Sequence, residues 1–511
     1  MATTKSIRTD YLNAAPSLQA FYQYPVQQPD FAQIVADKGH EAIDRKTLQQ
    51  VIKEQYEGLA LSEASQRHLD LLGEDNTFTI TTGHQLVLLG GPMFTTYKVL
   101  TAIKLAQQLS EQHSEQNFVP IFWIHTEDHD YEEINHYFQS FQQKQTYQGS
   151  FQTMVGDHVL TEEIESVLPA HFEERLRRTY RPGRKMSEAF RDYINELFGS
   201  YGVLMLDADD PRLKARFREV LKAEVKDHAA FSQVNATSDA LTKAGYPAQI
   251  HAREINLFFL DQLGRNRIVS ENGHYEAVDR DLKWSPSELN QLIEQHPEHF
   301  SPNVSLRPLY QEMILPNLCY IGGWGELSYW LQLKGVFAHF GVNFPLLLPR
   351  MSATIVPRSV KQVWESKNLE DSDFRSSLPV IYRKYMPQIW DDQPFLVQSE
   401  RILAEIDKLT TLIDGELSHT LARSGEALKV KTARYLQNLE KKAHRVKRHQ
   451  QPKDFKELKE LKEQVQPDGL VQERILSLGS FPKVAPERLI QLAWEHCNPL
   501  NLAHVFLHLD D

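Results

Sequence analysis

A glycine-containing turn with polar neighbours is the first feature of the sequence that could carry chemistry. The segment TTGHQLVLLGGPMFTTYK occupies residues 81–98, between a β-rich stretch and a helical one. Such a turn exposes backbone N–H groups, and the positive end of the following helix attracts anions. We therefore expect a cradle for phosphate or carboxylate, with close packing of a tight connection as the alternative. The candidates are Gly83, His84, Gln85, Gly91, Pro92 and Lys98.

Four consecutive titratable residues form a second candidate site. They stand in WIHTEDHDYEEIN, residues 123–135, where an apolar stretch that predicts a buried strand ends. In open parallel sheets, ligands bind outside the carboxyl ends of the strands. These groups could bind an ammonium group, act as a general base or hold a divalent metal, or they could simply favour the dipole of a helix. The candidates are Glu127, Asp128, His129 and Asp130.

A second glycine turn and two arginines complete the candidate residues. The segment NVSLRPLYQEMILPNLCYIGGWGELSYW, residues 303–330, again combines a strand, a glycine turn and a helix. An arginine can bind carboxylate or phosphate through two parallel hydrogen bonds, although Arg307 could instead pair with Glu312 or another acid. We take Cys319 as a core residue. The candidates are Asn303, Arg307, Gly322, Gly323, Glu326 and, after the last apolar strand, Arg350.

Apolar stretches predict the strands that must position these residues. Residues 77–83 and 118–125 read as strands on either side of a helix over 92–112. A strand, helix and strand in this order form a βαβ unit, so a parallel sheet follows. Further core strands are expected in 202–211 and 344–350.

The pattern changes towards the C-terminus. Apolar residues at heptad spacing predict a near-continuous helix over 399–448, which Pro452 ends, and a returning helix over 453–465. This predicts a helical hairpin, a coiled-coil arm. The expected parts are an N-terminal helical segment of the core (1–75), a core (76–395) with insertions near 138–200 and 262–300, an antiparallel coiled-coil arm (396–470) and a tail that packs back on the core (471–511).

Composition excludes several classes of function. The chain has 511 residues and a net charge of −12, which disfavours nucleic-acid binding because phosphate neutralisation needs a basic surface. We read the basic stretch 429–450 as a solvated helix face. Two cysteines cannot form a four-cysteine zinc site, the histidine–glutamate zinc signature is missing, and no zinc is expected. The sequence shows no apolar signal segment and no run long enough to span a bilayer, so we expect a cytoplasmic protein without a membrane role.

Taken together, the motifs resemble one family. TGHQ, GGP and YK, then FWIHTEDHDYEEIN, then LRPLYQE and YIGGWGELSYW, then PR, are similar to the bacillithiol biosynthesis cysteine-adding enzymes. The resemblance implies a Rossmann-like core with two inserted connecting segments, and a C-terminal coiled coil that forms a homodimer. Two positions depart from the family pattern: Trp324 stands where proline tends to follow the paired glycines, and His125 replaces a small or apolar residue.

The resemblance also implies a reaction, the joining of the cysteine carboxyl group to the amine of glucosaminyl malate. Amide formation from a free carboxylate is uphill, and an adenylate or an acyl phosphate made from ATP is the usual means of activation. By analogy we therefore expect ATP or ADP as cofactor, with Mg²⁺. His84 and Lys98 would then stabilise phosphate charge, an acid of the 127–130 segment would hold or deprotonate an amine, and Arg307 or Arg350 would bind the malyl carboxylates. Two alternatives stay open: a nucleotidyltransferase or synthetase relative that acts on another small acid, and a coiled-coil scaffold with an inactive core.

Overall fold

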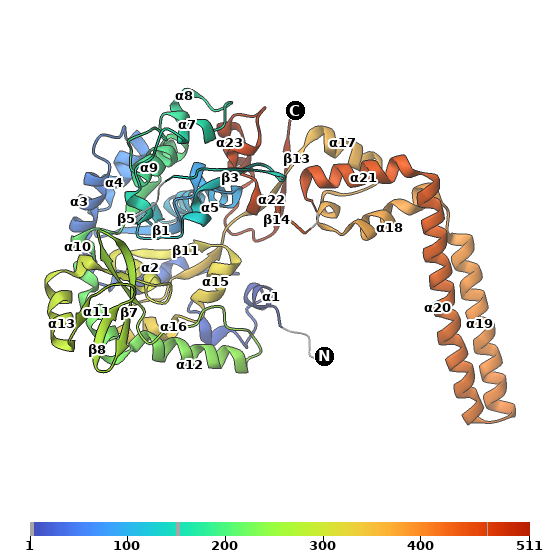
Figure 1. Ribbon diagram of the computed structural model, residues 1–511. Helices are drawn as coiled ribbons and strands as arrows, with labels where there is room; N and C mark the ends of the chain where they lie inside the picture. Colours follow the sequence, from blue (N-terminus) through green and yellow to red (C-terminus); the bar gives the residue numbers. More distant parts are fainter. Residues whose placement is uncertain (1–4, 150–153, 468, 511) are drawn as a thin grey trace. The chain divides into compact units, whose positions relative to one another are not determined.

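The computed structural model describes residues 5–149, 154–467 and 469–510 of the chain (Figure 1). The chain divides into two compact units. The first comprises Met1–Ala353 and Glu473–Val505, and the second comprises Thr354–Gln472 and Phe506–Asp511. Every described helix is too short or too polar to cross a lipid bilayer.

A five-stranded parallel sheet forms the centre of the first unit. The strand order is β12, β11, β1, β2 and β5, and each neighbouring pair is parallel. The strands are almost entirely buried, as expected of a parallel sheet that is covered on both faces. The predicted α/β class with a Rossmann-like parallel sheet is therefore confirmed. The strands are Thr77–His84 (β1), Asn117–Ile124 (β2), Leu204–Asp207 (β5), Asn317–Gly322 (β11) and Leu346–Pro349 (β12).

The strand order creates a switch point between β1 and β11. The chain runs outward from β1 through β2 to β5, and then returns to the other side of β1 with β11 and β12. At such a point the connections leave towards opposite faces and open a crevice outside the carboxyl ends of the strands. His84 ends β1 and Gly322 ends β11, so the two glycine-turn motifs meet at this crevice.

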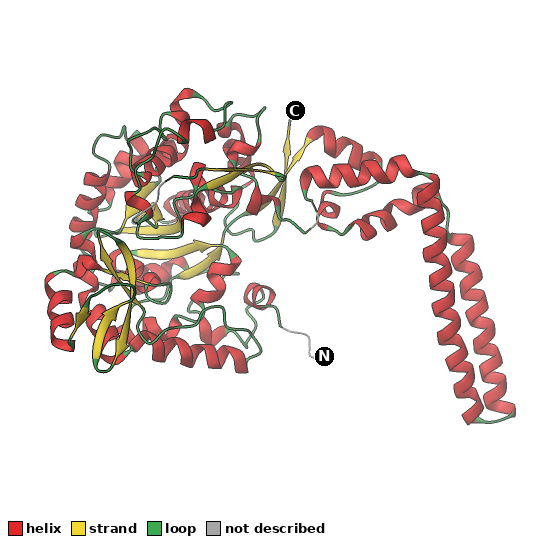
Figure 2. Ribbon diagram, in the orientation of Figure 1, coloured by secondary structure: helices red, strands yellow, loops and turns green. Residues whose placement is uncertain are grey.

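Helices from distant parts of the sequence cover the sheet (Figure 2). The long helix α5 contacts β1, β2 and β11. In addition, α2 contacts β11, α3 contacts β5, α4 contacts β2 and β5, and α15 contacts β11 and β12. Asp30, Asp44 and Ser62 cap the helices that follow them, because each side chain accepts a backbone N–H of the first turn. These covering helices are α2 (Phe31–Gly39), α3 (Arg45–Gln55), α4 (Glu63–Leu71), α5 (Met93–Gln112) and α15 (Trp324–Trp330).

The first insertion, between β2 and β5, differs in part from the expected mostly helical segment. It begins with an antiparallel hairpin of His136–Ser140 (β3) and Gln143–Thr146 (β4). These strands are short and polar, so their alternation gives little signal in the sequence. Residues 150–153 of this insertion lie outside the described residues. The insertion returns to the sheet through α9 (Met186–Phe198), whose Phe190 stacks on Phe122 of β2.

The second insertion is a small antiparallel sheet with the strand order β10, β6, β7, β8 and β9. Its helix α13 (Pro286–Gln295) starts with a capping box of Ser285 and Glu288. The strands are Leu257–Asp261 (β6), Gly264–Glu271 (β7), His274–Ala277 (β8), Lys283–Trp284 (β9) and Phe300–Pro302 (β10).

Further helices of the first unit are α1 (Ile7–Leu12), α6 (Tyr131–Ile134), α7 (Ile164–Val167), α8 (Glu174–Arg177), α10 (Pro211–Lys214), α11 (Arg218–Asp227), α12 (Ala229–Lys243), α14 (Arg307–Ile314), α16 (Lys334–Phe340) and α23 (Pro486–His496). Helix α22 (Gln472–Ile475) begins at the boundary between the units.

The second unit has an apolar core of its own. Trp364 of α17 (Arg358–Ser366) stacks on Phe374, with ring centroids 4.2 Å apart, and α18 (Leu378–Ile389) and α21 (Pro452–Val465) pack around this pair. The unit begins at Thr354, whereas the sequence places the end of the core at residue 395. The boundary lies earlier because α17 and α18 bury their apolar faces against α21. β13 (Ser352–Pro357) and β14 (His504–Leu509) pair where the chain passes between the units.

The long helical hairpin is built differently from the sequence prediction. A single helix over 399–448 is wrong, because the chain turns at Leu417 and Ser418 between α19 (Gln393–Glu416) and α20 (His419–Gln450). Ser418 starts α20, since its side chain accepts the N–H of Leu421. α19 and α20 lie side by side and form the two arms (Figure 1). The expected returning helix over 453–465 is α21, which belongs to the apolar core of the unit.

We expect Gly425→Ala to destabilise this hairpin by about 1–3 kcal/mol, the usual effect of overpacking. A Cβ atom on Gly425 of α20 would overlap the side chain of Thr410 on α19. Thermal and urea unfolding of the second unit would measure the loss. Gly415→Ala is the matched control: a Cβ atom there meets nothing within 4 Å, and a helical alanine should gain about 0.5–1 kcal/mol. Equal effects of the two changes would contradict the close helix contact.

Candidate active site

A cavity of about 650 Å³ opens at the carboxyl edge of the parallel sheet. The motifs that follow β1, β2, β11 and β12 all contribute to its walls. The structure thus brings together residues from all three sequence motifs, and adds Arg350. The sequence-predicted residues that line the cavity are His84, Gln85, Lys98, Asp128, Asn303, Arg307, Gly323, Glu326 and Arg350.

An ion pair between the buried Lys98 and the partly exposed Glu326 stands in the cavity wall. The Nζ atom of Lys98 lies 2.6 Å from a carboxylate oxygen of Glu326 and donates a hydrogen bond of 2.8 Å to the carbonyl of Gly83. The same Glu326 oxygen accepts the N–H of Gly323 at 2.8 Å, and the other accepts the hydroxyl of Tyr320 at 2.9 Å. Burial acts to raise the pKa of Glu326, but the attraction of Lys98 outweighs it and the pKa is lowered. Burial in turn lowers the pKa of Lys98, although Glu326 opposes this. The lowered pKa of Glu326 and the 2.6 Å contact favour the charged pair, which holds Lys98 beside the end of β1.

Two histidines beside this pair are neutral. Burial, together with the nearby Lys98 charge, lowers the pKa of His84 to about 3. Burial and the Arg307 charge hold the pKa of His125 well below its ordinary value. The Nε2 atom of His84 is buried and has no hydrogen-bond partner, while its ring packs edge-on against Phe94. His84 therefore offers a ligand a neutral imidazole, which can donate or accept a hydrogen bond but carries no charge near pH 7.

We expect these histidines to make the free energy of unfolding fall as the pH drops below about 6.5. An unfolded histidine takes up a proton near pH 6.5, whereas folded His125 stays neutral. Between the two pKa values the unfolded state binds the extra proton, so stability falls by about 1.4 kcal/mol per pH unit for each histidine. Urea unfolding of the wild type and His125→Gln from pH 7.5 to 5.5 would measure this slope, which should be shallower in the variant. The exposed His339 supplies the control His339→Gln, and equal slopes in all three proteins would contradict the expectation.

Arginines give the cavity an excess of positive charge. Arg307 donates to the side chain of Gln311 at 2.9 Å, and the expected alternative of an ion pair with Glu312 is not formed, because Glu312 accepts hydrogen bonds from Gln311 and Asn317. Arg350, in contrast, donates to buried Glu473 at 2.8 Å. The cationic residues of the lining are Lys98, Arg265, Arg307, Arg350 and Arg474, and the acidic ones are Asp128, Glu133 and Glu326.

Acidic residues gather at the ends of β2 and β5, around a smaller cavity of about 60 Å³. Asp128 accepts a hydrogen bond of 2.7 Å from Gln85, which turns its carboxylate towards the main cavity. The Lys214 ammonium lies 2.5 Å from both Glu127 and Asp209. Burial and repulsion by Glu127 raise the pKa of Asp209 to about 7, although Lys214 opposes this. The acidic side of the site, at the ends of β2 and β5, is thus suited to bind an ammonium group or an amine.

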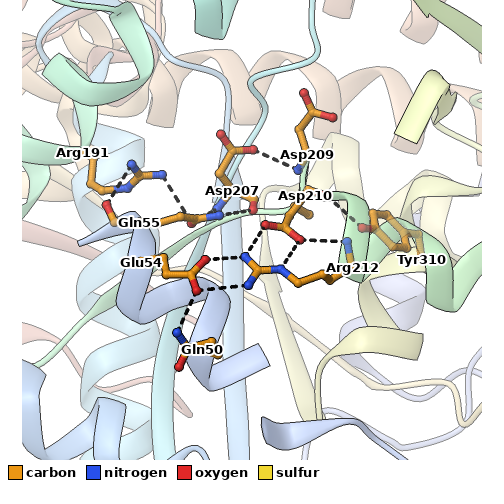
Figure 3. Close-up of polar contacts among 10 residues, drawn as sticks. Gln50, Glu54, Gln55, Arg191, Asp207, Asp209, Asp210, Arg212 and Tyr310 are labelled. Carbon is orange, nitrogen blue, oxygen red and sulfur yellow. Dashed lines mark hydrogen bonds and ion pairs between the residues drawn. The ribbon is translucent and has the colours of Figure 1, made fainter. Parts of the chain in front are cut away.

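The loop after β5 is tied to α3, as Figure 3 shows. The backbone N–H of Asp207 donates to the side chain of Gln55 at 3.0 Å, and the same side chain donates back to the Asp207 carbonyl at 2.7 Å. Arg212 bridges Asp210 and Glu54 at 2.8 and 2.6 Å. These contacts fix the loop that carries Asp209.

The turn before α5 does not form the expected anion cradle. The N–H groups of Gly90 and Gly91 donate to carbonyls within the turn, and that of Met93 donates to the carbonyl of Leu476 at 2.7 Å. Gly91 and Pro92 lie outside the cavity lining. Gly91 instead provides the left-handed backbone that the turn requires, with φ of 78°. The amides of Gly90, Gly91 and Met93 are therefore already bonded within the protein.

Four other candidates serve the structure around the cavity. A Cβ atom on Gly83 would lie 3.0 Å from the Trp123 carbonyl, and one on Gly322 would lie 2.8 Å from the Leu327 side chain, so both positions need glycine for close packing. Asp130 caps α6, because it accepts the N–H of Glu133, and the His129 side chain is half exposed. His129 and Asp130 do not line the cavity, which fits the helix-turn alternative for this half of the acidic segment.

Sequence reasoning missed several residues of the cavity wall. Glu133 lies in the same acidic segment as Asp128 and could have been included, and His125 stood out only as a departure from the family pattern. Arg265 comes from β7 in the second insertion, and Arg474 comes from the C-terminal part of the first unit. Nothing in the sequence around these two arginines distinguishes them from surface residues. The missed residues include Phe94, His125, Glu133, Arg265, Tyr329 and Arg474.

The fold defines a protein of the Rossmann-like class, with a cavity at the carboxyl edge of its sheet whose lining carries more cationic than acidic side chains. Residues 1–351 match the family described as "Bacillithiol biosynthesis BshC, N-terminal Rossmann-like domain", and residues 353–509 match "Bacillithiol biosynthesis BshC, C-terminal coiled-coil domain". The chain belongs to the bacillithiol biosynthesis BshC family, and it is an enzyme of the ligase class. The resemblance seen in the motifs is confirmed.

Individual relatives share nearly the whole chain. A protein of Christiangramia forsetii is 34% identical over 509 residues, with 96% of this chain and 94% of the relative covered. One of Cytophaga hutchinsonii is 31% identical, with the same coverage. A more distant one of Staphylococcus carnosus is 28% identical and covers 68% of each chain. Each of these proteins bears the name "Putative cysteine ligase BshC".

Proposed function

We propose that this protein joins the carboxyl group of cysteine to the amine of glucosaminyl malate, which yields bacillithiol. The charge pattern of the cavity at the carboxyl edge is the observation that carries the proposal. Cationic side chains outnumber acidic ones in its lining, and both substrates carry carboxylates. The names of relatives that span nearly the whole chain point to the same reaction.

The malyl end of the acceptor substrate is assigned to the arginines that have no acidic partner. Within the described part of the chain, no carboxylate forms an ion pair with Arg307 or Arg474, and Arg265 donates only to the Pro302 carbonyl at 3.0 Å. A guanidinium binds a carboxylate through two parallel hydrogen bonds. Arg350 is less suited to this task, because Glu473 already occupies one side of its guanidinium.

The carboxyl group that reacts is assigned to the Lys98 side of the cavity. The Lys98 ammonium is held in place by Glu326 and the Gly83 carbonyl, so it needs no reorganisation when negative charge develops nearby. His84 adds a neutral hydrogen-bonding group beside it. This arrangement stabilises an oxyanion at the carboxyl carbon while the new C–N bond forms.

The amine is assigned to the acidic side of the cavity. Asp128 lines the main cavity, and Asp209, with its pKa of about 7, lines the adjoining small one. Either carboxylate can hold the ammonium form and then accept its proton, which the amine must lose as it attacks the carbonyl carbon.

ATP, with Mg²⁺, is the proposed source of activation, and it would supply the energy that the carboxyl group needs to react. The residues of the cavity fit the phosphates of ATP only in part. The cavity has enough cationic side chains for a polyphosphate, but the amides of Gly90, Gly91 and Met93 before α5 already donate to carbonyls. Lys98 and the unpaired arginines are therefore the groups that would hold the phosphates.

The proposal is tested by incubating the pure protein with cysteine, glucosaminyl malate, magnesium and ATP, and by following bacillithiol with mass spectrometry. A parallel reaction omits ATP, and others replace cysteine with alanine or serine. Product that forms only with cysteine and ATP supports the whole scheme. Product without ATP keeps the ligase assignment but removes the proposed activation.

Two further outcomes would favour the alternatives. Product with other amino acids but not with cysteine favours a synthetase that acts on another small acid. A protein that binds neither substrate by calorimetry and forms no product favours a scaffold with an inactive core. Both outcomes contradict the proposal.

We also propose that the helical hairpin mediates a homodimer in the cytoplasm. Large apolar side chains at seven- and four-residue spacing remain exposed along α20, with Tyr435 exposed to 74%. Sedimentation equilibrium should give twice the chain mass, and Leu439→Glu should shift it to the monomer. A wild-type monomer at micromolar concentration would contradict the dimer. The exposed residues of α20 are Leu428, Tyr435, Leu439 and Val446.

A further inference from the structure

Three potential metal ligands meet at two helices of the second unit, and none of them is used in the proposed reaction. Asp392 is the first residue before α19, and Glu440 and His444 lie one turn apart on α20. One ligand atom from each of the three side chains lies within 4.8 Å of the others. The Nε2 atom of His444 is 3.6 Å from a carboxylate oxygen of Asp392.

Apart from the 3.6 Å ion pair between His444 and Asp392, no polar contact of these three side chains is found among the described residues. The Nε2 atom of His444 is buried and has no hydrogen-bond partner. Asp392 precedes α19 but its side chain does not cap the helix. Within the described residues, Glu440 has no hydrogen bond or ion pair. A buried imidazole nitrogen that faces two carboxylates with no other partner is unusual, because buried polar atoms are normally satisfied.

We propose that Asp392, Glu440 and His444 form a binding site for a divalent transition metal ion. One imidazole and two carboxylates are a donor set that suits Zn²⁺, Mn²⁺ or Fe²⁺, with water in the open positions. At metal–ligand distances of about 2.1 Å, neighbouring ligand atoms lie about 3–3.5 Å apart. The His444–Asp392 separation of 3.6 Å is close to this range, and the Glu440 ligand atom lies within 4.8 Å of both, so side-chain rotations would bring all three onto one ion.

The imidazole is already oriented for such a site. Trp390 packs edge-on against the His444 ring, with centroids 5.4 Å apart and an interplanar angle of 82°. Trp390 also packs against the apolar core of the unit. A bound ion would therefore join the start of α19 to the far end of α20, where the two arms of the hairpin meet that core. Its expected effect is to hold the two arms together, independently of the proposed ligase reaction.

The test is metal titration of the full-length chain after removal of metals with EDTA. A second cluster in the first unit, His296, Glu298 and His299, could also take up metal, so the measurements use a background in which both of its histidines are alanine. We expect this background protein to bind one equivalent of Zn²⁺ by calorimetry. Co²⁺ should give an intense visible absorption band, and Zn²⁺ should raise the melting temperature of the second unit by about 5 °C.

Variants of the ligands then identify the site. His444→Ala, Asp392→Asn and Glu440→Gln should each weaken Zn²⁺ binding by at least about 100-fold and remove the thermal shift. His419→Ala is the matched control, because His419 pairs with Asp414 on the same hairpin without a third ligand. Far-UV circular dichroism checks that each variant is folded. The proposal is overturned if the background protein binds no metal, or if His444→Ala binds it as tightly as the control does.

Discussion

Replacing Lys98 with methionine should lower kcat/KM of the proposed ligase reaction by about 10³-fold. The ammonium is the cationic group that the structure fixes most firmly at the cavity, through Glu326 and the Gly83 carbonyl. The loss of one preorganised charge-stabilising donor reduces turnover by about 10²–10³-fold. The change also leaves Glu326 without its cation, so the free energy of unfolding should fall by about 3 kcal/mol, the lower end of the range for a broken buried pair, since Glu326 is partly exposed to the cavity.

Steady-state kinetics and urea unfolding of the same protein separate the two effects. Lys104→Met is the matched control, because Lys104 lies on the same helix but packs over the ring of Trp494, outside the cavity lining. Its kcat/KM should stay within about twofold of the wild type. A Lys98→Met protein that is stable but retains its full activity would falsify the assignment of the reacting carboxyl group to this side of the cavity.

Replacing Glu473 with alanine should destabilise the first unit by about 3–5 kcal/mol, because the change leaves the buried charge of Arg350 without its partner. The side chains of Arg350 and Glu473 are only 8% and 6% exposed. Glu473 also accepts the hydroxyl of Ser352 at 3.1 Å and the N–H of Ala353 at 2.9 Å. One side chain thus holds the C-terminal segment of the unit to the end of β12.

The stability difference between the wild type and Glu473→Ala should decrease as the pH falls. Burial acts to raise the pKa of Glu473, but the attraction of Arg350 outweighs it and the net pKa is lowered. The stabilisation is therefore complete above the ordinary carboxyl pKa, and it disappears as the pH falls through the lowered one. Thermal unfolding at pH 7.5 should show the full difference between wild type and variant, and the difference should narrow below about pH 4.

A more exposed carboxylate in the same segment provides the comparison. Glu487 pairs with Arg175, but the two side chains are 42% and 36% exposed. Glu487→Ala should therefore change the free energy of unfolding by less than about 1 kcal/mol. If Glu473→Ala has as small an effect as Glu487→Ala, the buried pair does not anchor the segment.

Much of the parallel sheet could be predicted from the sequence. Parallel strands are buried on both faces, so their sequences are continuous apolar runs. FVPIFWIH and FPLLLPR are such runs, and both became strands. The polar hairpin of β3 and β4 could not be predicted in this way, because it is not buried on both faces. Its strands are short and half exposed, so they leave no apolar run.

The helical arm shows the limit of periodicity. Heptad spacing on α19 and α20 predicted helix correctly on both sides of Leu417 and Ser418, but it could not show the turn between them. Periodicity does not record the weak helix formers Gly415 and Ser418 beside the turn. The turn depends on the local cap at Ser418 and on the close contact of Gly425 with Thr410, which only the packed helices bring together.

The sequence by itself determined the strands of the parallel sheet, the glycine turns and the residues that stand at the carboxyl edge of that sheet, because each of these depends on neighbours in the chain. Only the tertiary structure decided which of those residues share a cavity. It brought Arg265 and Arg474 in from distant segments, and it left His129 and Asp130 outside. It also paired the Met93 amide with the Leu476 carbonyl, which removed the expected anion cradle. The physical reason is that the role of a hydrogen-bond donor or a charge depends on the groups that contact it in the folded chain. Those groups can lie hundreds of residues away in the sequence.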